Sequence, residues 1–169
     1  MQMQTDQLDG RELDYWTVRA LAHDDRPLIV VATEPRIVAT FASGDVSWMD
    51  RRVSASSDWA DAAAVLDRVA ELRTTRIGDH TVRVEARFTC LQEDGTAEGR
   101  GEGPSLRVAL LRAFVRARFG DAVGSVPAEP HVVQGGQVKA HPAGEPLPSG
   151  SERRDAPHDP HEIGALPRP

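Results

Sequence analysis

The segment from His80 to Leu91 constrains the fold of this chain more than any other. Its apolar side chains occur at every second position, and they are Val82, Val84, Ala86, Phe88 and Cys90. Because successive side chains of a β-strand point to opposite faces, this period of two predicts a strand with one buried and one solvated face. The chain therefore contains a sheet whose apolar side must be covered by other elements.

Three segments predict the helices that cover this sheet. The first begins at Thr5 or Asp9 and ends near residue 23, the second covers residues 56–73, and the third covers residues 106–119. Apolar runs at 28–33, 36–43 and 45–49 predict further strands, and Asp94–Gly95 is typical of a hairpin turn. The pattern predicts an α+β fold, with a small, mostly antiparallel sheet packed by two or three helices.

The composition changes near Pro127. Nine of the twelve prolines and four of the six histidines lie from there to the end of the chain, and the aliphatic periodicity is lost. Such a segment buries too little apolar surface to offset the entropy of ordering it. We therefore predict a single α+β domain over residues 1–127 and a disordered tail, rich in Pro, Gly and His, over residues 128–169.

The charge and the cysteine content limit the partners of the chain. Its net charge is −6, which disfavours nucleic acids, because phosphate neutralisation supplies most of the affinity for them. Cys90 is the only cysteine, so no intramolecular disulfide can form. The polar start of the chain and the lack of a long apolar run predict a cytoplasmic protein with no membrane partner.

The turn at Gly103, Pro104 and Ser105 opens the third helix and is the first candidate ligand site. Ser105 can cap the exposed N–H groups, and the start of a helix attracts anions. On a helical wheel Arg107 falls inside the apolar arc, close to any anion at the first turn, whereas Arg112 falls outside it. Ala109 also falls outside this arc, which consists of Leu106, Leu110, Leu111, Phe114 and Ala117. The alternative is a capped core helix whose arginines lay their stems along its flanks.

The segment from Ser56 to Trp59 is the second candidate. It offers the hydroxyls of Ser56 and Ser57, the carboxylate of Asp58 and the indole of Trp59. A planar ring can stack on the indole, and the carboxylate can accept hydrogen bonds from ligand hydroxyls. The alternative is that Ser57 or Asp58 caps the second helix while Trp59 packs in the core.

No catalytic motif accompanies these two segments. The chain has no Walker loop, Rossmann fingerprint, nucleophile elbow or zinc motif. His158 and His161 lie in the proline-rich tail without other metal ligands nearby. We therefore expect a non-enzymatic protein with no cofactor and no bound metal.

Three blocks, residues 8–22, 53–68 and 103–127, resemble in order the NinX-like family of phage and prophage proteins, a family of unknown function. The resemblance implies an accessory protein that acts in the cytoplasm of a bacterial host. It draws attention to Asp14, Ser56, Ser57, Asp58, Trp59, Gly103, Pro104, Ser105 and Arg112. Arg107 stands where the family usually carries an apolar residue. The strands at 28–33 and 36–43 lie between the first two blocks, and they either enlarge the sheet or form an edge through which two copies associate.

Together these features predict a protein that binds a small, nucleotide-like anion. A ring would stack on Trp59, and a phosphate would meet the helix start at Ser105. In a phage, such a protein would sequester a host immune signalling nucleotide. One alternative is a module that docks on a host protein and inhibits it. The other is a nucleic-acid binder, because the helix–sheet–helix order resembles that of double-stranded-RNA-binding modules, with Arg112, Arg116 and Arg118 facing phosphates.

Overall fold

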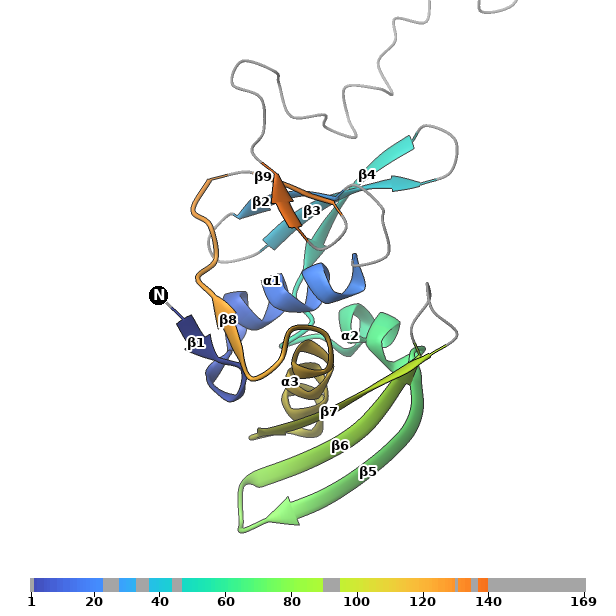
Figure 1. Ribbon diagram of the computed structural model, residues 1–169, viewed down its shortest axis with the longest axis vertical. Coiled ribbons are helices and arrows are strands. Elements are labelled where there is room, and N and C mark those ends of the chain that lie inside the picture. Colours follow the sequence, from blue (N-terminus) through green and yellow to red (C-terminus); the bar gives the residue numbers. More distant parts are fainter. Residues whose placement is uncertain are drawn as a thin grey trace, which may run out of the picture.

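The computed structural model confirms the α+β class (Figure 1). It describes residues 2–22, 28–32, 37–43, 47–89, 95–129, 131–134 and 137–139. Helix α1 (Gly10–Leu21) contacts strand β3 of a five-stranded sheet on one side and helix α3 (Leu106–Phe119) on the other. Helix α3 in turn covers a three-stranded sheet, so the two sheets enclose the helices. Among the described residues, no helix is long and apolar enough to cross a membrane.

The three-stranded sheet contains the strand that the alternating pattern predicts. It is antiparallel, in the order β5 (Val69–Ile77), β6 (Thr81–Thr89) and β7 (Thr96–Gly103). Val84, Ala86 and Phe88 of β6 are buried, so the apolar face is confirmed for them. Cys90 and Asp94 lie outside the described residues.

Helix α3 packs directly on β7, because every second residue from Gly99 to Gly103 is glycine. A Cβ atom added to Gly99 or Gly101 would overlap the backbone of α3 at Ala113 or Ala109. At these glycines the strand presents no side chains to the helix, and the two backbones approach closely. Ala109 is completely buried at this contact. The helical wheel, which placed Ala109 outside the apolar arc, was wrong because it took no account of a glycine surface.

The five-stranded sheet covers the other side of α1. Its order is β10-β9-β2-β3-β4, and all neighbours are antiparallel. The strands are β2 (Leu28–Ala32), β3 (Ile37–Ser43), β4 (Ser47–Val53), β9 (His131–Gln134) and β10 (Gln137–Lys139). Strands β2 and β3 both have a neighbour on each side. They belong to a second sheet and do not enlarge the sheet that contains β6, and they do not form an edge, so both alternatives are wrong.

The predicted helix over residues 56–73 is wrong in its second half. Helix α2 spans only Trp59–Leu66, and the chain then continues as β5. Eight of the nine residues of β5 pair with β6, and Ala70 lies at a register shift between Val69 and Glu71. The hydrogen bonds of this ladder outweigh the helical spacing of the apolar residues, and β-branched residues such as Thr74 and Thr75 favour the strand.

The predicted boundary at residue 127 is also wrong. Strands β9 and β10 lie beyond it, and β9 pairs with β2 through Val132 and Val133. The Tyr15 hydroxyl of α1 lies 2.8 Å from His131 Nε2 of β9. A short second pairing joins β1 (Gln2–Gln4) to β8 (Ala122–Gly124), with the 3-10 helix η1 (Thr5–Gln7) after β1. The ordered domain thus reaches Lys139, and residues 140–169 lie outside the described residues.

Candidate functional site

The two candidate segments meet at the starts of α2 and α3. The Arg107 Nε atom donates a hydrogen bond of 3.0 Å to the Ser56 carbonyl oxygen. The Arg107 guanidinium carbon also lies 5.6 Å from the centre of the Trp59 ring. Arg107 therefore forms one surface with Ser56 and Trp59, which lie about fifty residues earlier in the sequence. We call this surface the Trp59–Arg107 shelf.

The shelf is held in place through the backbone of Ser56. The Asp14 carboxylate of α1 accepts a hydrogen bond of 2.6 Å from the Ser56 N–H, while Arg107 bonds to the carbonyl of the same residue. Burial raises the pKa of the Asp14 carboxyl above its ordinary value, and the hydrogen bond from Ser56 only partly offsets this effect. Asp14 thus belongs to the site as a support for the loop, and it is buried below the shelf.

The shelf is open to solvent. The Trp59 side chain is 40% exposed, which differs from the interpretation that it packs in the core. Within the described residues the two Nη atoms of Arg107 make no hydrogen bond or ion pair, since only its Nε is engaged. An exposed indole beside a guanidinium with free donors can receive a ring and an anionic group.

Several other candidate residues serve the helix ends. Asp58 caps α2 by accepting a hydrogen bond of 2.9 Å from the Ala60 N–H. Ser105 caps α3 by accepting one of 3.3 Å from the Val108 N–H. The Ser57 hydroxyl donates to the Ser54 carbonyl at 3.2 Å. These polar groups border the shelf, but each is already engaged within the chain.

Gly103 and Pro104 differ in their surroundings. Gly103 is buried, and a Cβ atom there would lie 2.9 Å from a side-chain carbon of Val108, so the glycine makes room for α3. The side of Gly103 on which a side chain would stand thus faces the helix. Pro104 is exposed and borders a hollow of about 290 Å³ beside the turn between β5 and β6. That hollow is lined by Arg76, Asp79, His80, Thr81, Val82 and Pro104, and it does not include Trp59 or Arg107.

Arg112 lies away from the shelf. Its Nε donates to the Leu8 carbonyl at 2.8 Å, and its Nη1 donates to the Glu102 carbonyl at 2.5 Å. Burial lowers the pKa of this guanidinium below its ordinary value. Arg112 therefore joins the N-terminal segment to the end of β7, and we do not include it in the candidate site.

The remaining arginines of α3 are also engaged by the backbone. Arg116 donates to the Arg100 carbonyl at 2.8 Å. Arg118 donates to the Thr89 carbonyl at 3.3 Å. The duplex-RNA interpretation requires these guanidinium groups to face phosphates, so their bonds to backbone carbonyls count against it.

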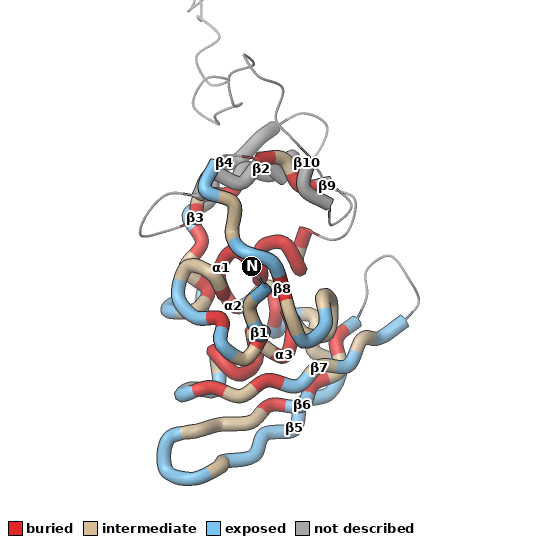
Figure 2. Tube along the Cα trace, turned by 60° about the vertical axis from the view of Figure 1, so that its left-hand side comes forward, coloured by how far each residue is buried: buried red, intermediate tan, exposed pale blue. Residues whose placement is uncertain are grey.

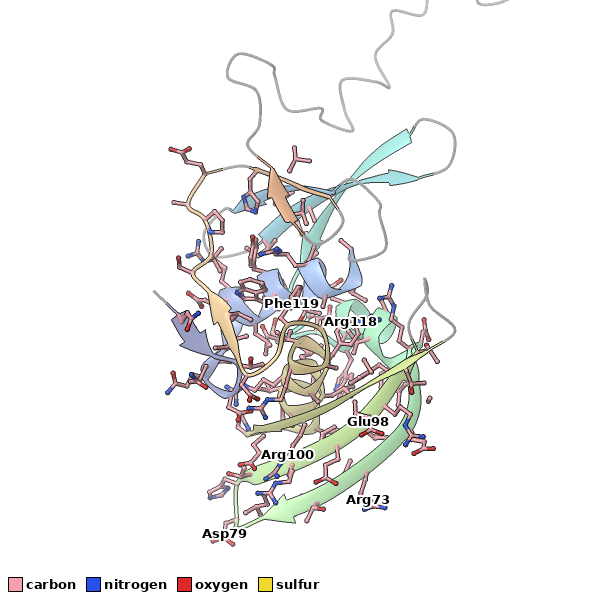
Figure 3. The ribbon with its side chains drawn as sticks, viewed as in Figure 1. Arg73, Asp79, Glu98, Arg100, Arg118 and Phe119 are labelled. Carbon is pink, nitrogen blue, oxygen red and sulfur yellow. The ribbon has the colours of Figure 1, made fainter. Side chains whose placement is uncertain are left out.

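The alternating pattern predicted a solvated face for β6, but it did not indicate that β5 and β7 extend this face into a charged surface. A hollow of about 760 Å³ lies there, lined by acidic and basic side chains of all three strands. Arg73, Glu98 and Arg100 are labelled on it in Figure 3. The charged residues of the alternating strand, Arg83, Glu85 and Arg87, indicated its solvated face. Strands β5 and β7 had not been predicted as the neighbours of this strand.

Comparison of the chain with protein-family models and with curated proteins found no match. The resemblance to the NinX-like family therefore stays a prediction. Within the described residues, no group of three or more His, Cys, Asp or Glu side chains could hold a metal ion.

Proposed function

We propose that the protein is a non-enzymatic binder of a small, nucleotide-like anion, which it holds on the Trp59–Arg107 shelf. The proposal rests on one observation, the exposed Trp59 ring beside a guanidinium whose Nη atoms have no partner in the described residues. A nucleobase would stack on the indole, and a phosphate would accept hydrogen bonds from the Arg107 fork.

Two features of the surroundings support an anionic ligand. Helices α2 and α3 both begin beside the shelf, at Trp59 and Leu106, and the start of a helix carries a partial positive charge. The Ser56 backbone is also held at both its N–H and its carbonyl. Because this loop is already ordered, ligand binding would lose little conformational entropy there.

The biological role that we propose follows from the resemblance to phage proteins. A phage accessory protein that retains a host immune signalling nucleotide would lower the free concentration of that signal. Retention requires tight binding and no turnover. Arg107 stands where the resembling family usually carries an apolar residue, so the ligand preference of this chain would be its own.

Isothermal titration calorimetry with cyclic dinucleotides and ADP-ribose tests the proposal. We expect one ligand to bind the wild-type protein, and we expect Arg107→Ala to weaken it about tenfold, which corresponds to about 1.4 kcal/mol. Trp59→Ala should weaken binding similarly, whereas Trp59→Phe should keep part of the affinity because it keeps an aromatic ring.

The matched control is Arg52→Ala, which removes an exposed arginine of β4 outside the shelf. It should bind like the wild type. Recovery of the ligand unchanged after long incubation would support retention without turnover. The proposal fails if no member of the panel binds more tightly than about 1 mM.

A further inference from the structure

Strand β5 is an uncovered edge of the three-stranded sheet. Within the described part of the chain it pairs with β6 on one side and with no strand on the other. All residues from Ala70 to Arg76 are exposed, and Figure 2 shows this strand pale blue along most of its length. Such an edge presents unpaired N–H and carbonyl groups to which another strand can bond.

The outer face of the sheet carries rows of alternating charge that end at β5. Arg87 of β6 lies opposite Glu71 of β5 and Glu98 of β7, and its guanidinium contacts each of these carboxylates at 2.9 Å. In the next row Glu85 of β6 lies between Arg73 of β5 and Arg100 of β7. At the open edge, one row therefore ends in a carboxylate and the neighbouring row in a guanidinium.

We propose that two copies of this chain associate through β5, which pairs antiparallel with its own copy about a two-fold axis at Leu72. In this register Glu71 lies opposite Arg73 of the partner subunit, and Arg73 lies opposite Glu71 of the partner subunit. The two three-stranded sheets become one continuous sheet. Each row then runs through both subunits with strictly alternating charge.

The charges of β5 select this register. An axis at residue 71 would place Glu71 against its own copy, and an axis at residue 73 would do the same for Arg73. Like charges directly opposite each other destabilise a strand pair, and opposite charges stabilise it. An axis at Thr74 would leave no pair of opposite charges. Charged residues on an edge strand oppose unspecific pairing, and here they leave one favourable arrangement.

The opposite face of the strand supports the same axis. Leu72 is 44% exposed and would meet Leu72 of the partner subunit. Cross-strand contact between two such side chains removes apolar surface from water. The register of β5 shifts between Val69 and Glu71, which limits the regular pairing to a few residues. We therefore expect a dimer that dissociates on dilution.

Sedimentation velocity over a wide range of concentrations tests this proposal with the full chain. The wild type should shift from monomer to dimer as its concentration rises. Glu71→Arg and Arg73→Glu should each stay monomeric, because each places like charges opposite each other twice. An equimolar mixture of these two variants should dimerise, because every Arg then faces a Glu. Circular dichroism of each variant shows whether it is folded.

Disulfide cross-linking tests the register in a Cys90→Ser background. Leu72→Cys should form a dimer under mild oxidation, because the two cysteines lie opposite each other. Thr74→Cys is the matched control on the same face, and it should cross-link at least tenfold more slowly, because it would lie opposite Ala70. A wild type that is monomeric throughout would overturn the proposal. So would equal cross-linking at both positions, or variants that dimerise as the wild type does. The proposed ligand binding does not enter these measurements, so either proposal can fail alone.

Discussion

The Asp14 carboxylate accepts a 2.6 Å hydrogen bond from the Ser56 N–H, and this contact joins α1 to the loop that precedes α2. The two residues are 42 positions apart, and Asp14 is only 5% exposed. The loop that carries Trp59 is thus held by a buried carboxylate. Its ionised form is penalised by burial, and the negative charges of Asp61 and Asp9 add to that penalty.

Two replacements of Asp14 should distinguish the stabilisation by its hydrogen bond to Ser56 from the cost of its buried charge. Asp14→Asn keeps an oxygen that accepts from Ser56 and removes the buried charge, so at neutral pH we expect a free energy of unfolding equal to or above that of the wild type. Asp14→Ala leaves the N–H without this acceptor and should lower the free energy of unfolding by about 1–3 kcal/mol. Urea denaturation of the three proteins measures both effects.

The difference in free energy of unfolding between the wild type and Asp14→Asn should change with pH in one direction. Because the folded-state pKa of Asp14 is raised above 3.8, the folded state binds more protons than the unfolded state between these two pKa values. The free energy of unfolding of the wild type should therefore fall, relative to Asp14→Asn, as the pH rises through this window. A constant difference between the two proteins from pH 3.8 to neutrality would contradict this assignment.

Arg107 and Trp59 should be energetically coupled in the absence of any ligand. The guanidinium lies 5.6 Å from the ring centre, and a partly exposed cation–π pair contributes about 0.5–1 kcal/mol. A double-mutant cycle with Arg107→Ala and Trp59→Ala, measured by urea denaturation, should give a coupling energy of this size. Strictly additive single effects would show that the two side chains do not interact in solution.

Gly101 should tolerate no side chain. A Cβ atom there would overlap the Ala109 carbonyl oxygen, and α3 would have to move away from β7. We expect Gly101→Ala to lower the free energy of unfolding by about 3 kcal/mol or more. The control is Gly124→Ala in β8, where no atom lies within 4 Å of the added Cβ. It should change stability by less than about 1 kcal/mol, and equal effects at the two positions would refute the close approach.

His131 should make the docking of β9 sensitive to acid. Its Nδ1 lies 2.9 Å from the Glu129 carbonyl, which can only accept, so Nδ1 carries the proton and Nε2 accepts from the Tyr15 hydroxyl. Burial lowers the pKa of His131 below 6.5, so the unfolded state binds more protons in the window between the two pKa values.

The stabilisation by neutral His131 is thus complete above pH 6.5 and is lost as the pH falls through the folded-state pKa. Thermal denaturation should show that the wild type loses stability on acidification relative to His131→Gln, which does not titrate. The slope is opposite in sign to that of Asp14, so each variant isolates one group. Parallel pH profiles of the wild type and His131→Gln would contradict this role.

Predictions from local sequence were correct where the periodicity or the capping residue was clear. The alternation of Val84, Ala86 and Phe88 predicted the buried face of β6. The predicted helix starts were Thr5 or Asp9 for α1, Ser57 or Asp58 for α2, and Ser105 for α3. The helices begin directly after Asp9, Asp58 and Ser105. These features need only the chain's own periodicity and capping chemistry, so the sequence expresses them directly.

The end of α2 could not be predicted in the same way. Leu66, Val69 and Leu72 have helical spacing, but β6 offered hydrogen bonds to residues 69–77 that no local pattern reveals. No sequence pattern marked the glycines of β7 as a contact surface, and only the packed helix shows them as one. Strand β9 was missed because its partner β2 lies about a hundred residues earlier.

The sequence by itself determined the class of the fold, the main strand, the helix starts and the residue types that the candidate site offers. Only the tertiary structure decided which of those residues meet. It brought Trp59 and Arg107 together, directed Arg112 to backbone carbonyls, and left β5 as an open, charged edge. The physical reason is that periodicity and caps act over a few residues, whereas strand pairing and close packing join segments far apart in the chain.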